Sequence, residues 1–285
     1  MSETIGSFLG PGSQPAEEDG GVLDYMKMPS AMSTFAVPDL PEAEEIKGLD
    51  AAKAAMDDLL VVLERVATGG ATQGAGNEVD LIHLDEDNLA FVNQVLGEGE
   101  VSVIGGNGSQ AQEAVLAGVW RVRQFDGENR LRRDYVEVAG FPKLVLASAF
   151  AKAQTSVPVP GQFPANVFNA PPLLPEINEH IPLVVPGGDP HVINLSLLPH
   201  TEEDLVFLND ILGRGPVTIL SRGYGNCRIT ATATRNVWWV QFYNSQDTLI
   251  LNSIEITEIP EVACAAGEDI ADSAQRLKEI LEVYR

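Results

Sequence analysis

The chain has 285 residues, 45% of them hydrophobic, and its 41 acidic against 18 basic residues give a formal net charge of −23 at pH 7. This charge disfavours nucleic acid and anionic membrane surfaces as partners, because both are bound through a basic patch. It fits a basic partner, and it fits solubility alone equally well.

The start of the chain, MSETIGSF, has no signal-peptide pattern, and no apolar run approaches the length of a membrane span. Cys227 and Cys264 are too few for a disulfide framework and favour a reducing compartment. We therefore expect a cytoplasmic protein.

Residues 1–48 differ from the remainder, with nine acidic residues, two lysines and many Gly and Pro residues. This composition predicts a flexible acidic N-terminal segment. Within it, sparse apolar residues from Met26 to Leu40 have two interpretations. They form a linear element that docks on a partner or on the protein itself, or they belong to an inert tail.

A first α+β unit is predicted over residues 49–146. An apolar stripe from Ala52 to Ala67 indicates a helix, and residues 79–84 indicate a short strand. Asp85 is a good N-cap for a second helix that stops at Gly97. Strands are expected at 100–105, 112–125 and 130–139.

A Pro-rich linker over residues 147–172 leads to a second unit over 173–285. Thr201 and Asp204 form a capping-box pattern for a helix that stops at Gly213. Strands are expected at 216–221, 227–243 and 248–258, and a helical stripe from Ile270 to Tyr284 closes the chain. The turn sequences DGEN and NSQD predict a hairpin from the last two strands of each unit.

The two units repeat one another in sequence. Seven residues recur 116 positions later, namely Leu89, Phe91, Asn93, Leu96, Gly97, Gly99 and Val101. The repeat continues at an offset of 118, with Trp120 matched by Trp238 and Glu137 by Glu255. We therefore predict an α+β fold built by internal duplication of a helix–strand–helix–three-strand unit, with mainly antiparallel sheets and a C-terminal helix.

The motifs favour binding over catalysis. The glycine-rich loops at 105–108 and 221–226 each lead into a strand, whereas a phosphate cradle opens onto a helix N-terminus. The histidines and cysteines lack metal-ligand spacing, and no nucleophile motif is present. Glu137 and Glu255 fit a repeated strand position better than an acid–base pair. We predict no catalytic residue, no cofactor and no metal.

The hairpins of the two units differ in character. In the first unit WRVRQFDGENRLRRDYVEV is rich in arginine, whereas the second has WWVQFYNSQDTLILNSIEI, which carries more aromatic surface than one buried face can hide. Arg and Tyr are common interface anchors. We therefore place partner binding on the second unit, at Arg222, Tyr224, Asn226, Trp238, Trp239 and Glu255.

Long stretches of the chain resemble the HupH/HyaF-type hydrogenase expression proteins, namely MSTFAVPDLPE (32–42), NAPPLLPEI (169–177), SRGYGNCRI (221–229), NVWWVQFYNSQDTLILNSIEITEIPEVACAA (236–266) and EDIADSAQRLKEIL (268–281). The resemblance implies an accessory protein that matures a membrane-bound uptake nickel–iron hydrogenase. It also implies a chaperone that holds the iron–sulfur small-subunit precursor, with other maturation proteins as further partners, before twin-arginine export.

Two other functions stay open at this point. One is a redox or iron–sulfur assembly factor that uses Cys227 or Cys264. The other is a subunit scaffold without client specificity. Visible absorption would reveal a bound cluster, and co-purification with the small-subunit precursor would separate a chaperone from a scaffold.

Overall fold

The computed structural model describes residues 48–69, 76–223 and 225–284. Nearly all of the expected flexible segment 1–48 lies outside these ranges. The helices and strands, in chain order, are α1 (Asp50–Ala67), β1 (Glu78–Asp80), α2 (Glu86–Leu96), β2 (Val101–Ile104), β3 (Ser109–Glu113), β4 (Val119–Phe125), β5 (Leu131–Val138), α3 (Lys143–Ala149), α4 (Leu173–His180), β6 (His191–Asn194), α5 (Glu202–Leu212), β7 (Thr218–Ser221), β8 (Asn226–Ala231), β9 (Val237–Tyr243), β10 (Leu249–Ile256) and α6 (Gly267–Val283). Single 3-10 turns lie at η1 (Ile181–Leu183), η2 (Leu195–Leu197) and η3 (Glu261–Ala263).

The predicted helix ends are confirmed. The Asp85 carboxylate accepts a hydrogen bond from the Asn88 backbone N–H at 2.9 Å, which caps α2. Thr201 and Asp204 form a full capping box at the start of α5. Both helices end at a glycine with positive φ, Gly97 at 55° and Gly213 at 62°, a conformation that costs glycine little.

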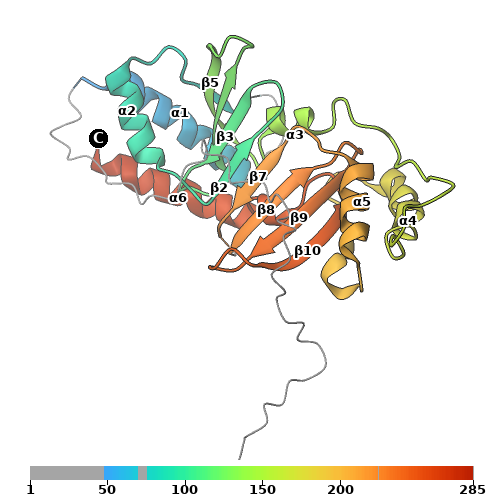
Figure 1. Cartoon of the computed structure of the whole chain (residues 1–285). Helices are drawn as coiled ribbons and strands as arrows, with labels where there is room; N and C mark the ends of the chain where they lie inside the picture. The colour runs from blue at the N-terminus through green and yellow to red at the C-terminus, as the bar shows by residue number, and fades with distance from the viewer. Residues whose placement is uncertain (1–47, 70–75, 224, 285) are drawn as a thin grey trace, which may run out of the picture. The chain divides into compact units, whose positions relative to one another are not determined.

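All the named strands form one antiparallel sheet, in the order β1-β5-β4-β3-β2-β7-β8-β9-β10-β6. The order within the first half (α1 to α3) is the mirror of the order within the second half (α4 to η3), and β2 and β7 join the halves at the centre (Figure 1). The α+β class, the antiparallel pairing and the C-terminal helix are confirmed, and each half has the same strand connectivity.

The predicted three strands after the second helix of each unit are wrong in number, because four are present. The expected strand 112–125 contains the turn between β3 and β4, and the expected strand 227–243 contains the turn between β8 and β9. Gly118 and Asn236, at equivalent positions, reverse the chain with φ of 75° and 61°. The turns were not predicted because the apolar and β-branched residues on either side of them are typical of a strand. The predicted strand 79–84 is shorter, since β1 ends at Asp80.

One face of the sheet carries a continuous buried row. The paired residues along it, strand by strand, are Tyr135, Val122, Ala111, Val103, Ile219, Ile229, Val240 and Ser253. Helix α3 and turn η3 cover this face with Val145, Ala149 and Ala263. The row crosses the join between the halves, so both halves share one apolar layer.

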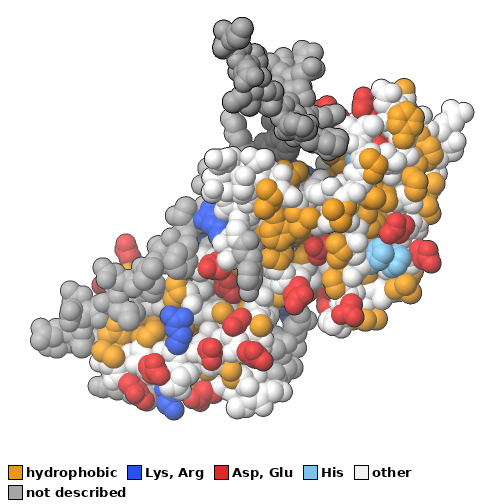
Figure 2. Space-filling model, turned by 90° about the horizontal axis from the view of Figure 1, so that it is seen from below, with side chains coloured by type: hydrophobic (Ala, Val, Ile, Leu, Met, Phe, Trp, Pro, Cys, Tyr) orange, Lys and Arg blue, Asp and Glu red, His pale blue; other side chains and the backbone are white. Residues whose placement is uncertain are grey.

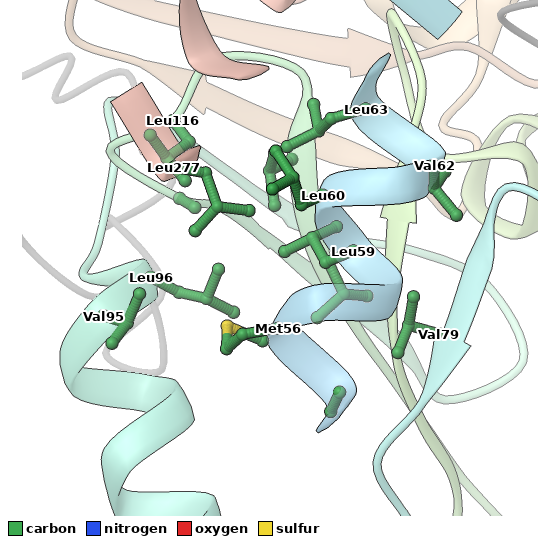
Figure 3. Packing of buried hydrophobic residues seen from close by; sticks show 14 of the residues in the cluster. Met56, Leu59, Leu60, Val62, Leu63, Val79, Val95, Leu96, Leu116 and Leu277 are labelled. Carbon is green, nitrogen blue, oxygen red and sulfur yellow. The ribbon is translucent and has the colours of Figure 1, made fainter. Parts of the chain in front are cut away.

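On the opposite face the helices cover the outer strands of each half. Helices α1 and α2 pack on β4 and β5, and helices α4 and α5 pack on β9, β10 and β6. Helix α6 follows the second half in the chain but packs in the core of the first, beside α1 (Figure 1). In Figure 3, Leu277 from α6 and Leu96 from α2 lie on the same side of α1 as Met56.

Candidate protein-binding surface

The loop between β7 and β8, which was expected to bind a partner, lies beside the join of the two halves. The Arg222 backbone N–H donates to the carbonyl oxygen of Glu100 at 3.1 Å, and the Arg222 side chain is half-buried. Asn226 begins β8 opposite Tyr243. Tyr224 lies outside the described residues. The loop is therefore anchored to the first half.

Trp238 belongs to the core and offers no exposed surface to a partner. Its side chain is fully buried, its indole N–H donates to the Thr257 carbonyl oxygen at 3.2 Å, and its ring meets Phe150 edge-on at 5.0 Å. Trp120 makes the matching contacts in the first half, donating to Ala139 at 3.0 Å. The repeated tryptophan is therefore a structural residue.

Trp239 and Glu255 are both half-buried, on opposite faces of the sheet. The Trp239 indole N–H donates to the Asn252 side-chain oxygen at 2.5 Å, beside the core of the second half. Glu255 lies opposite Trp238 in the strand register, and burial raises the pKa of its carboxyl to about 6. Of the hairpin residues expected to bind, these two retain some exposed surface.

The arginines of the first hairpin are mostly neutralised. Arg121 forms a buried ion pair with Asp134. Asp126 in the hairpin turn accepts from Arg130 and Arg132, at 2.9 and 2.6 Å, and Arg133 pairs with Glu78 at 2.6 Å. Because most of these arginines are paired with carboxylates, the two hairpins differ less in free positive charge than their sequences suggest.

Glu137 and Glu255 cannot act on one substrate. They lie on β5 and β10, which are seven strand steps apart in the sheet, and at about 4.8 Å a step this separates them by roughly 30 Å. Glu137 is buried and accepts from the Lys143 N–H at the start of α3. Burial raises the pKa of this carboxyl to about 7. Its role is to support α3.

Both thiols are shielded. Burial raises the pKa of the Cys227 thiol to about 12, with a further contribution from Glu255. Burial likewise raises the pKa of Cys264 to about 12, and its S–H donates to the Pro260 carbonyl oxygen at 3.6 Å. Within residues 48–69, 76–223 and 225–284, no three His, Cys, Asp or Glu side chains are grouped to hold a metal ion.

The outer end of the second half carries an exposed apolar surface. We name it the outer surface; its exposed members are Phe163, Phe168, Leu183, Val185, Val192, Leu197, Leu198, Val206 and Ile250. Figure 2 shows hydrophobic side chains gathered over this half around the histidines, with acidic side chains among them. Leu197 is 80% exposed, and Val192 on β6 is 49% exposed.

Specific contacts hold the segments of the outer surface together. The backbone N–H groups of residues 168–170 donate to the Asp204 carboxylate at the start of α5, at 2.8 to 3.0 Å. The rings of His180 and His191 stack at 3.5 Å, which joins α4 to β6. The Asn252 N–H donates to the Ser196 hydroxyl at 2.8 Å, which joins η2 to β10. The surface is thus built on fixed elements.

The chain matches a known protein family. The family model described as the C-terminal conserved region of HupH hydrogenase expression protein matches residues 51–155 and 167–284. The chain belongs to the HupH family.

Three relatives of this HupH-family chain match over nearly its whole length. The hydrogenase expression/formation protein HoxQ of Cupriavidus necator is 45% identical and covers 96% of this chain and 95% of its own. HupH of Rhodobacter capsulatus is 46% identical, over 97% and 96%. The hydrogenase-1 operon protein HyaF of Escherichia coli is 35% identical, over 99% and 97%.

Family membership gives this chain a coarse function, an accessory role in the expression and formation of hydrogenase. The two matched segments coincide with the two halves of the HupH-family sheet. Among the helices in the described ranges, none has the length and apolar character of a membrane span.

The outer surface was not predicted from the sequence, because β6, α4 and the turns η1 and η2 were not predicted. A signal for it was present. Residues 153–213 contain no lysine or arginine, seven acidic residues and many apolar ones. A run of apolar and acidic residues without a basic one, in a chain that elsewhere carries both charges, indicates a surface that is apolar and negatively charged.

Proposed function

We propose that this protein is a non-enzymatic, cytoplasmic chaperone in the maturation of a membrane-bound uptake nickel–iron hydrogenase. Its client is the precursor of the iron–sulfur small subunit, which it holds before twin-arginine export. The observation that carries the proposal is the exposed apolar outer surface. Apolar side chains exposed among polar and acidic groups on a folded protein are typical of a protein-binding site.

The state of the thiols supports this function over a redox or cluster-assembly role. A thiolate is the nucleophile and the metal ligand in such chemistry, and reactive cysteines have a lowered pKa. Cys227 and Cys264 have the opposite shift, each to about 12. Both thiols stay protonated at neutral pH, which fits structural residues.

We also propose that the β7–β8 loop contributes contacts to the client, through Arg222, Tyr224 and Asn226, with Trp239 and Glu255 adding to them from the second hairpin. These positions remain candidates because Arg and aromatic side chains anchor many interfaces. Replacing Arg222 and Tyr224 together by Ala is expected to weaken capture of the precursor while the melting temperature is nearly unchanged.

The test is affinity capture from cells that express the hydrogenase operon, followed by mass spectrometry of the bound proteins. We expect the small-subunit precursor with its export signal attached, together with a visible spectrum of the isolated protein that lacks iron–sulfur bands. Capture of no hydrogenase subunit would exclude the chaperone function. Iron–sulfur absorption that is lost in a Cys227→Ala or Cys264→Ala variant would favour the assembly-factor alternative.

A further inference from the structure

We propose that the outer surface binds an extended protein segment that combines apolar side chains with lysine or arginine, and that this segment adds to the sheet as a new strand along β6. The inference deepens the proposed function and rests on it, since it takes the partner to be a protein client. It assigns the chemistry of the bound segment and the element that binds it.

The first argument is the charge of the outer surface. Lys152 and Arg214 flank sixty-one residues, 153–213, that carry no basic side chain at all. Among the acidic residues of this stretch, five are exposed, namely Glu179, Asp189, Glu202, Glu203 and Asp210. In Figure 2 no Lys or Arg side chain is visible on this part of the face. A stretch of apolar and acidic residues without a basic one is complementary to an apolar segment that carries cations.

The second argument is the edge of the sheet. Among the described strands, β6 is the last in the order and pairs with β10 alone. Its sequence, His-Val-Ile-Asn, has no charged residue of the kind that blocks pairing at an edge, and Val192 is exposed. Extended peptides commonly bind by adding a strand to such an edge.

The opposite edge of the same sheet shows the contrast. Strand β1 holds the equivalent outer position in the first half and carries two acidic residues, Glu78 and Asp80. Glu78 is also engaged by Arg133 at 2.6 Å. Charged residues on a short strand protect an edge from pairing. The fold therefore places acidic residues on one edge and none on the equivalent edge.

The negative charge of the outer surface also favours one kind of bound segment over others. A second copy of this chain joined edge to edge would bring two acidic surfaces together, which repels. The acidic N-terminal segment of the same chain has nine acidic residues against two lysines over residues 1–48 and is repelled likewise. A cationic segment is attracted, and its apolar residues cover Val192 and Leu197.

The test uses the full-length protein and two synthetic peptides with the same alternating valine and serine sequence, one led by two arginines and one by two glutamates. The first variant carries Val192→Lys and Leu197→Lys. The matched control carries Val61→Lys and Val283→Lys, which are 65% and 67% exposed on helices α1 and α6. All four sites are exposed, so we expect both variants to keep the wild-type melting temperature.

We expect the wild-type protein to bind the arginine peptide in preference to the glutamate peptide. The Val192/Leu197 variant should bind it roughly tenfold more weakly or worse, because it adds like charge and removes apolar contact. The Val61/Val283 control should bind as the wild type does. A second variant, Glu179→Gln with Asp189→Asn, should reduce the salt dependence of binding. Equal binding of both peptides, or equal loss in the control, would overturn the proposal.

Two further readouts separate the alternatives. Light scattering that shows a dimer lost only in the Val192/Leu197 variant would assign the edge to a second copy and overturn the proposal. Capture of the small-subunit precursor by wild type and by the Val192/Leu197 variant alike would keep the chaperone function and exclude this surface. Failure of the wild type to capture the precursor, with selective peptide binding intact, would exclude that client and retain the surface.

Discussion

Val103 of β2 lies directly opposite Ile219 of β7, and the two residues hold the same position in the two halves of the chain. The residues on either side of this pair are matched crosswise. Ser102 lies opposite Leu220, which is the equivalent of Ile104, and Ile104 lies opposite Thr218, which is the equivalent of Ser102. An approximate two-fold axis therefore passes through the pair at the centre of the sheet. Both side chains are buried in the shared apolar layer.

The two halves are expected to unfold together, because they share this layer and because α6 packs in the first half. Ile219→Ala should lower the free energy of unfolding by about 2 to 4 kcal/mol and leave a single transition. Chemical denaturation followed by circular dichroism and by tryptophan fluorescence measures this. Val61→Ala on the exposed face of α1 is the control and should change stability by under about 0.5 kcal/mol. Two separate transitions would contradict the shared core.

The repeated tryptophans should contribute alike to stability. Trp120→Phe and Trp238→Phe each remove an indole N–H from a buried carbonyl oxygen, which we expect to cost about 1 to 3 kcal/mol apiece. Thermal denaturation of the two variants measures the loss. Client capture below the melting temperature should be unchanged in both. Loss of capture in Trp238→Phe at wild-type stability would instead make Trp238 a contact residue.

Burial of Glu137 predicts a pH dependence of stability. Its pKa rises from 4.5 to about 7 in the folded protein, so folding favours the protonated carboxyl. This contribution is fully present below pH 4.5 and is lost as the pH rises through 7. Glu137→Gln, which keeps an acceptor for the Lys143 N–H, should therefore stabilise the protein at pH 8, by on the order of 2 to 3 kcal/mol.

The Glu137→Gln gain is measured from urea midpoints at pH 5 and pH 8 and should shrink at the lower pH. Glu282→Gln, at an exposed position on α6, is the control and should show no such trend. A gain of equal size at both pH values would mean that the effect is one of packing and that Glu137 does not titrate in this window.

The two thiols are expected to react slowly in the folded protein. A rise in pKa from 9.0 to about 12 lowers the thiolate fraction on the order of a thousandfold at neutral pH. Colorimetric titration with a disulfide reagent should show slow modification in the native protein and fast modification in denaturant. Client capture by a Cys227→Ala/Cys264→Ala double variant should equal that of the wild type; fast native labelling would reopen the thiol-based function.

Local signals predicted much of the fold. The capping residues Asp85 and Thr201 and the stop glycines fixed both repeated helices, because these signals act within a few residues of the chain. The turns at Gly118 and Asn236 escaped detection, since their neighbours are apolar or β-branched like those of a strand. The packing of α6 on the first half could not be read either, because helical spacing indicates which face is buried but not against what.

The candidate site was harder to predict than the fold. Aromatic content drew attention to Trp238, yet an indole that supplies a buried N–H and one that binds a partner look the same in sequence. The outer surface depends on which face of β6 and which turns remain uncovered, and that is decided by packing across the sheet. In the sequence, only the absence of basic residues from 153–213 indicates this surface.

The place of α6 has a consequence for synthesis of the chain. The helix contributes Ile270, Leu277 and Leu281 to the same core as Met56 and Leu59 of α1. Two hundred residues separate the end of α1 at Ala67 from the start of α6 at Gly267, so the ribosome makes α1 well before this packing partner. Until α6 has left the ribosome, the part of the apolar face of α1 that packs on α6 stays uncovered. The core of the first half is therefore complete only once the chain has been made through α6.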